Sequence, residues 1–211
     1  PFYVSTTGTL ANNDYIEFYG VPNDGSLDTE LYDDPDWQLN PNYSLFNDTA
    51  VYYLTWNTLA PNRVVSNIPN DLNNLPGAED FFLKTDLYQF NARFNAGKPY
   101  YLGGSPSYRA IFDEGEGFYD ADFRKNNPRN YSINAPGIFT SGPNATINTS
   151  VISYSNTPHR VIIEWNSNLL SDQSYGVFAT NKYSFSLNAN QVGPNNTLQF
   201  TANGPAGVDN N

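Results

Sequence analysis

Alternation of apolar and polar side chains, which is the period of a β-strand, recurs along most of the chain. The clearest case is Arg160–Trp165, where Val161, Ile163 and Trp165 share one face. Similar short runs end at Gly, Pro, Asn or Asp, and no long stretch has the 3.6-residue period of an amphipathic helix. The pattern predicts an all-β fold, an antiparallel β-sandwich of jelly-roll or Greek-key type, with residues 1–211 as a single domain.

Further strands are expected where apolar runs lie between turn signals. Phe81–Phe94 fits no period cleanly and is assigned as a strand because its neighbours are β-like and aromatic-rich. The remaining expected strands are Phe2–Val4, Asn62–Ile68, Tyr100–Leu102, Tyr108–Phe112, Phe118–Phe123, Thr146–Tyr154, two short strands within Tyr175–Leu187, and Thr197–Ala202.

Two predicted strands, Tyr15–Gly20 and Thr49–Trp56, flank a long polar segment rich in Asn, Asp and Pro. In the second strand Tyr52, Leu54 and Trp56 share one face, and the opposite face is largely apolar as well. A strand with two apolar faces is typical of a sheet that is covered on both sides. We therefore expect a central strand here, with Tyr52, Leu54 and Trp56 in the core.

Composition excludes several classes of partner and chemistry. The chain has 21 acidic and 10 basic residues, a formal net charge of −11, whereas nucleic acids and anionic membranes require a basic surface. It has no Cys, which removes disulfides and thiolate nucleophiles. No apolar run approaches the length of about 18 residues that crosses a bilayer. We expect neither nucleic-acid binding nor membrane insertion.

The candidates for catalysis are few. His159 is the sole histidine, no Gly-x-Ser-x-Gly elbow accompanies it, and we interpret it as a structural hydrogen-bonding residue. Glu114 and Glu116 lie among glycines in a turn that we expect to be solvated, where nothing raises a carboxyl pKa as a glycosidase acid requires. We therefore expect this chain to have no enzymatic activity.

The acidic segment 24–36 contains the one candidate metal site. Asp24, Asp28 and Glu30 offer oxygen ligands on a loop, which suits Ca²⁺ because this ion accepts irregular geometry. Their spacing is not that of an EF-hand. The alternative, which we favour, is a solvated loop in which the Asp side chains cap turns.

Aromatic residues suggest a second function hypothesis. The chain has 3 Trp and 16 Tyr, whose rings could stack on sugars, and Trp37 in the polar loop is the best candidate for exposure. The same aromatics can instead fill a β core and bridge its strands, which we favour. A glycan partner, and with it a carbohydrate-binding module of a secreted multidomain protein, is therefore the alternative hypothesis.

The first part of the chain also carries a set of specific motifs. They are Tyr15-Ile-Glu-Phe-Tyr-Gly, Asn23-Asp-Gly, Leu27-Asp28, Leu31-Tyr32, Gln38-Leu-Asn-Pro, Tyr43-Ser-Leu-Phe and Asp48-Thr-Ala-Val-Tyr. This set resembles the non-catalytic β-domain that lies N-terminal to the protease domain in gingipain-type (C25) cysteine peptidases and related type IX secreted proteins. Weaker similarities are at Gly115-Glu-Gly-Phe118, His159-Arg-Val161 and Asn195-Asn-Thr-Leu198.

The resemblance implies a place in a larger protein rather than a chemistry. It implies an accessory or pro-domain of an exported bacterial peptidase, secreted or held at the cell surface, that assists folding, latency or positioning. The implied partner is the protease domain of the same polypeptide. Because the chain begins with Pro1 and contains no Met, we also expect it to be a fragment of a longer protein.

Overall fold

The computed structural model describes residues 2–6, 8–55, 75, 77–109, 112–153 and 155–204. The fold is mostly β, as predicted, and its named strand pairs are antiparallel. The strands are β1 (Phe2–Val4), β2 (Ile16–Phe18), β3 (Arg93–Asn95), β4 (Tyr100–Leu102), β5 (Ser105–Ser107), β6 (Gly117–Tyr119), β7 (Arg129–Asn134), β8 (Ala145–Ile152), β9 (His159–Trp165), β10 (Asn168–Tyr175), β11 (Thr180–Leu187) and β12 (Asn195–Ala202). Three short 3-10 helices are η1 (Ser26–Leu31), η2 (Pro35–Trp37) and η3 (Ala189–Gln191).

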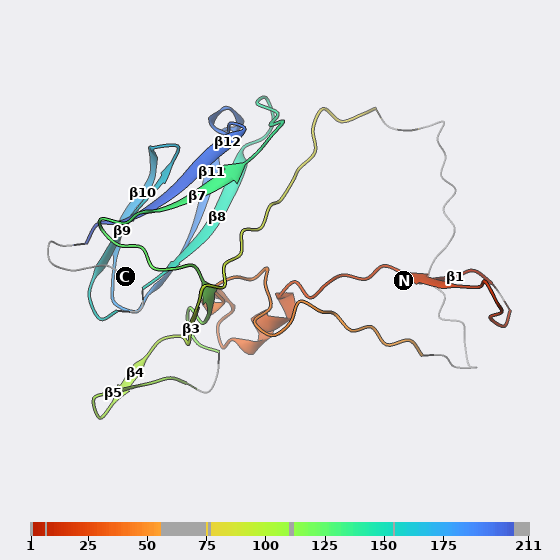
Figure 1. The fold of residues 1–211 in the computed structure, drawn as a ribbon, viewed down its shortest axis with the longest axis horizontal. Coiled ribbons are helices and arrows are strands. Elements are labelled where there is room, and N and C mark those ends of the chain that lie inside the picture. The colour runs from red at the N-terminus through yellow and green to blue at the C-terminus, as the bar shows by residue number, and fades with distance from the viewer. Residues whose placement is uncertain are drawn as a thin grey trace.

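Strands β7 to β12 form the largest body of the molecule, which we call the β-body (Figure 1). Four of them make a sheet in the order β10-β9-β12-β7, and β11 pairs with β8 in a second sheet. Both sheets contribute to one hydrophobic core, whose buried members are Val151, Val161, Ile163, Trp165, Leu187, Val192, Leu198 and Phe200. The core therefore belongs to the β-body.

Strand β9 confirms the prediction made from its alternation. Val161, Ile163 and Trp165 are 2%, 0% and 3% exposed, while their neighbours in the strand are less buried. The Trp165 indole N–H donates to the Gln191 carbonyl at 3.0 Å, so the one polar atom of this buried ring is satisfied. Strand β9 pairs with β10 on one side and β12 on the other, which makes it an interior strand.

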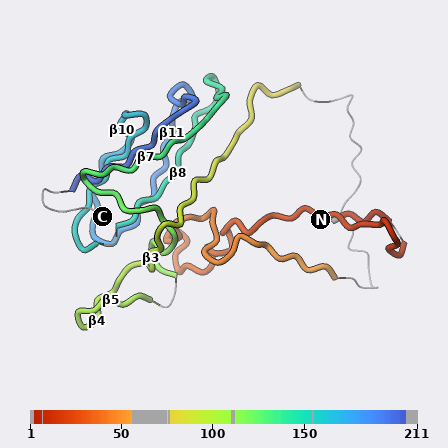
Figure 2. Tube along the Cα trace, viewed as in Figure 1, coloured from red at the N-terminus to blue at the C-terminus, as the bar shows by residue number. Residues whose placement is uncertain are grey.

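Residues 2–6, 8–22 and 46–55 extend away from the β-body (Figures 1 and 2). Strands β1 and β2 form a hairpin on the far side of the molecule, paired from Phe2↔Phe18 to Val4↔Ile16. Residues 46–55 and 77–92 belong to no strand. We call these two extended segments the first arm and the second arm. Within the described residues no helix is long and apolar enough to cross a membrane.

The predicted central strand Thr49–Trp56 is wrong over its described part. Residues 49–55 form no strand, and Tyr52 and Leu54 are 51% and 66% exposed instead of lying in the core. A central strand needs a backbone partner on each side, and in the part of the chain that is described this segment has none of the ladder pairing. Trp56 lies outside the described residues.

Other strand boundaries also differ from the predictions. Strand in Phe81–Phe94 is limited to its last two residues, at the start of β3, and Tyr175–Leu187 contains one long strand, β11, in place of two short ones. Of Tyr108–Phe112, Phe112 forms an isolated parallel bridge with Tyr32. Strand β7 and most of β10 were not predicted, and Asn62–Ile68 lies outside the described residues.

Candidate interaction surface

The five motifs between Asn23 and Phe46 fold into a loop, residues 23–47, that we call the anchored loop. Gly25 begins it with φ +85° and is buried. A Cβ at this position would lie 2.3 Å from the Tyr43 carbonyl carbon, so only glycine permits the two ends of the loop to approach this closely. The Asn23-Asp-Gly motif therefore has a steric explanation.

Asp28 closes the anchored loop from inside. Its side chain is 4% exposed; one carboxylate oxygen accepts from the Ser44 hydroxyl at 3.2 Å and the other from the Leu45 backbone N–H at 2.7 Å. Hydrogen bonds to a charged acceptor contribute about 1.5 to 3 kcal/mol each. The Leu27-Asp28 and Tyr43-Ser-Leu-Phe motifs are thus the two halves of one polar clamp.

Gln38 and Tyr32 extend the same network toward the β-body. The buried Gln38 amide donates to the Gly25 carbonyl at 3.2 Å and accepts from the Thr29 hydroxyl at 2.7 Å. The Tyr32 hydroxyl donates to the Glu116 carbonyl at 3.0 Å. Burial is the main reason that the pKa of Tyr32 lies well above its usual range, so this hydroxyl remains a donor at physiological pH.

The corner formed by residues 113–117 receives the anchored loop, and it is not the solvated turn that the sequence predicted. Asp113 is 2% exposed, and Gly115 and Gly117 are buried as well. Burial, with a smaller repulsion from Asp113, raises the pKa of the Glu116 carboxyl above its ordinary value. Glu114 accepts from the Thr180 backbone N–H at 3.3 Å, which ties the corner to β11.

The three candidate calcium ligands do not converge on one point. Asp24 is exposed and accepts from the Ser26 backbone N–H at 3.0 Å, in a local turn that leads into η1. Both carboxylate oxygens of Asp28 already accept hydrogen bonds from Ser44 and Leu45, and Glu30 is exposed. Among the residues that the structure describes, no group of three or more His, Asp or Glu side chains could hold a metal ion. Calcium binding by this segment stays a prediction that requires its own measurement.

His159 is buried at the start of β9 and is 2% exposed. Its Nε2 lies 3.1 Å from the Ser155 hydroxyl, and its ring stacks on Tyr175 with centroids 5.6 Å apart. Burial lowers the pKa of the imidazole. This Ser–His pair has the spacing of a nucleophile and its base, but the Ser155 hydroxyl also hydrogen-bonds the Thr157 hydroxyl at 2.8 Å and the His159 ring packs against Tyr175, which favours the structural role.

The first arm leaves the anchored loop and exposes most of its apolar side chains. Val51, Tyr53 and Leu54 are 67%, 91% and 66% exposed. One side chain holds the arm against the segment that follows β2: the Tyr52 hydroxyl accepts from the Val21 N–H at 2.6 Å and donates to the Val21 carbonyl at 2.7 Å. The arm is therefore held in place at Tyr52 while its other large side chains face solvent.

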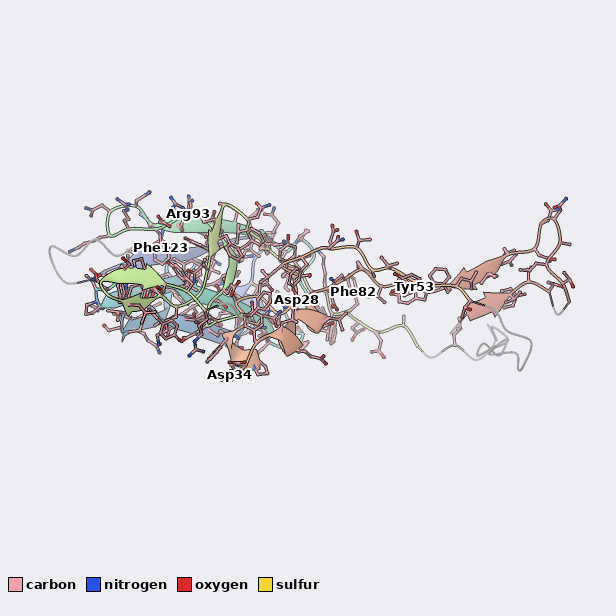
Figure 3. The ribbon with its side chains drawn as sticks, turned by 90° about the horizontal axis from the view of Figure 1, so that it is seen from below. Asp28, Asp34, Tyr53, Phe82, Arg93 and Phe123 are labelled. Atoms are coloured by element: carbon pink, nitrogen blue, oxygen red, sulfur yellow. The ribbon has the colours of Figure 1, made fainter. Side chains whose placement is uncertain are left out.

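The second arm contacts the β-body with one set of rings and exposes another. Phe81 stacks on Phe139 with centroids 5.5 Å apart, and Phe90 lies 5.0 Å from the Tyr131 ring. Phe82 and Leu83 between them are 83% and 82% exposed. Figure 3 places Phe82 and Tyr53 along the part of the molecule that leads from the β-body toward β1.

The two arms make up the candidate interaction surface, and Figure 1 shows them extending in different directions. Burying Leu54, Phe82 and Leu83 would each contribute about 1.5 to 3 kcal/mol, or about 4.5 to 9 kcal/mol in all, which is comparable to the net stability of a whole domain. Exposed apolar side chains on extended backbone are typical of a surface that another polypeptide covers. The sequence matches no family model and no curated protein sequence.

The apolar side chains of the first arm are evident in the sequence, where their pattern predicts a position in the core. Apolar side chains on both faces of 49–55 do indicate burial on two sides. The structure locates them where the described residues of this chain provide no cover.

Proposed function

We propose that this chain is a non-catalytic accessory domain of an exported gingipain-type peptidase, and that the two arms pack against the protease domain of the same polypeptide. The observation that carries the proposal is the exposure of large apolar side chains on two extended arms beside a rigidly anchored loop. Five of the motifs that resemble the gingipain accessory domain build that loop. The docked domain would assist the folding, latency or positioning of the protease, in a protein that is secreted or held at the cell surface.

The finer fold assignment belongs to the same proposal. Two antiparallel sheets that share one core support a β-sandwich, and jelly-roll or Greek-key wiring is the form expected for an accessory domain of this kind. In this arrangement the β-body is the scaffold and the anchored loop holds the base of the first arm.

The test is binding in trans between this chain and the separately produced protease domain of the longer polypeptide. The double variant Phe82→Ser/Leu83→Ser removes two exposed apolar side chains, which would weaken binding more than a hundredfold if both are buried on docking. Leu169→Ser is the matched control, because Leu169 is 62% exposed on β10, away from the arms. Equal binding by the double variant and the control would contradict the proposal.

The proposal also states that this chain catalyses no hydrolysis of its own. The purified chain should leave peptide and glycoside substrates intact. Reproducible hydrolysis that the single substitution His159→Ala abolishes would overturn this part of the proposal.

A further inference from the structure

A polar hollow of about 460 Å³ lies on the outer face of the four-stranded sheet, beside the turn between β9 and β10. The side chains around it share one property, because each is a neutral amide or hydroxyl. They are Asn130, Ser132, Asn166, Ser167, Thr197 and Gln199. The hollow has no place in the function proposed above, since it belongs to the β-body and not to the arms.

The hollow is built on paired strands. Ser132 lies opposite Thr197, and Asn130 lies opposite Gln199, in the register of β7 and β12. The Gln199 side-chain amide donates to the Asn130 amide oxygen at 2.6 Å, which fixes the orientation of both groups. On β12 the intervening residue, Leu198, is buried in the core, so the backbone beneath the hollow is held rigidly.

The turn between β9 and β10 forms the third side. Asn166 and Ser167 have φ of 49° and 64°, the left-handed conformation that a two-residue hairpin turn requires. Asn166 is clamped to β12: its side-chain oxygen accepts from the Thr197 N–H at 2.8 Å, and its NH₂ donates to Asn196 at 3.0 Å. Ser167 occupies a position where Gly is the usual residue, and it presents a hydroxyl at the edge of the hollow.

Much of the hydrogen-bonding capacity around the hollow is unused. Among the described residues, the hydroxyls of Ser132, Ser167 and Thr197 have no protein partner, and the second amide atom of both Asn130 and Gln199 is equally free. Five groups that donate or accept, two of them oriented by the Gln199–Asn130 hydrogen bond, match a ligand that carries several hydroxyls on a rigid ring.

We propose that this hollow binds a neutral sugar residue through hydrogen bonds alone. Among the described residues no ionisable side chain lines it, and Glu164 lies opposite Gln199 on β9, so with a net charge of −11 an anionic sugar is repelled. The described lining contains no aromatic ring either, so the affinity lacks a stacking contribution and falls in the millimolar range. This site differs from the Trp37 site that the sequence suggested.

The test is a titration of the whole chain with glucose, galactose, mannose and N-acetylglucosamine, and with glucuronate as the anionic comparison, followed by the NMR signals of the side-chain NH₂ groups. At least one neutral sugar should shift the Asn130 and Gln199 signals in a saturable manner below about 50 mM, and glucuronate should bind more weakly. Thr197→Val and Gln199→Ala should each weaken binding about threefold to tenfold, the cost of one or two hydrogen bonds.

Gln173→Ala is the matched control, because Gln173 is an exposed amide on β10 outside the hollow. An unchanged backbone amide spectrum verifies that each variant is folded. The absence of saturable shifts for all four neutral sugars would overturn the proposal, as would binding that Thr197→Val and Gln199→Ala weaken no more than Gln173→Ala does. Because the arms take no part, failure here leaves the docking proposal unaffected.

Discussion

Asp28 tests most directly how the anchored loop is held. In the clamp its carboxylate accepts two hydrogen bonds from the protein, whereas in the calcium hypothesis the same carboxylate binds the ion. The substitution Asp28→Asn keeps the size of the side chain but replaces one acceptor oxygen with an NH₂ group. That group must then face either the Ser44 hydroxyl or the Leu45 N–H, and both of these contact the carboxylate now.

The expected cost follows from those two contacts. At least one charge-assisted hydrogen bond is lost, at about 1.5 to 3 kcal/mol, and the remaining one becomes neutral and weaker. Asp28 is 4% exposed, so water does not replace the lost partner. We therefore expect Asp28→Asn to lower the free energy of unfolding by about 2 to 4 kcal/mol.

The assay is urea titration in EDTA, followed by fluorescence, with hydrogen exchange of the Leu45 amide as a local measure. Glu30→Gln is the matched control, since Glu30 is exposed on the same 3-10 helix and also belongs to the candidate calcium ligands. It should change the free energy of unfolding by less than about 0.5 kcal/mol. If both variants cost the same in EDTA, or if the Leu45 amide exchanges equally fast in both, the clamp is refuted.

The other predictions concern the core, the acidic corner and calcium. Ile163→Ala should lower the free energy of unfolding by about 2 to 5 kcal/mol in urea, whereas Leu169→Ala on the exposed face should lower it by less than about 0.5 kcal/mol. Equal losses in the two variants would contradict the placement of Ile163 in the core. Folding raises the pKa of Glu116 above its ordinary value of 4.5, so the folded chain binds this proton more tightly than the unfolded chain does. The free energy of unfolding should therefore fall as pH rises from 4.5 through the higher pKa of the folded state. Glu116→Gln should therefore reduce the difference in the free energy of unfolding between pH 4.5 and pH 7.5, measured by urea titration. If that difference is the same in the variant and the original chain, Glu116 is not the source of the pH dependence. If Asp24 and Asp28 bind calcium, saturating Ca²⁺ at about 100 times its Kd should stabilise the chain by roughly 2.7 kcal/mol and Mg²⁺ much less, whereas thermal melts identical in EDTA, Ca²⁺ and Mg²⁺ would leave only the loop role.

The β-body illustrates what alternation in a sequence can predict. Strand β9 has Val161, Ile163 and Trp165 at alternate positions, because one of its faces contacts the core and the other does not. Strands β7 and β10 were missed because Asn and Ser occupy positions where strand-forming residues are usual, so their propensity favours a turn. Pairing with β12 and β9 overrides that propensity, and the sequence of the strand itself does not contain this information.

The corner at residues 113–117 shows why glycine misled the site prediction. Two glycines among acidic residues indicated a flexible, solvated turn. In the structure a Cβ on Gly115 would lie 2.3 Å from the Thr180 hydroxyl, and one on Gly117 would lie 3.4 Å from Leu39. These glycines permit close packing, and burial of Glu116 follows from it. The neighbours that decide between the two roles, Thr180 and Leu39, are 65 and 78 residues away in sequence, so no local window contains them.

The first arm shows a different limit. Two apolar faces in residues 49–55 indicate a cover, but the sequence does not say whether that cover belongs to the same domain. Because Tyr53 and Leu54 are exposed, we expect the polypeptide that covers them to lie outside the described part of this chain. This inference is the physical basis of the docking proposal.

The most direct test of that proposal is hydrogen exchange of the two arms, measured by mass spectrometry on this chain alone and on the longer polypeptide with its protease domain. In this chain alone, residues 49–55 and 77–92 have no ladder pairing and should exchange at nearly unprotected rates. In the longer polypeptide, docking should slow exchange in both arms at least tenfold, while β9 is protected equally in the two samples. Equal, unprotected exchange of both arms in the two samples would contradict the account.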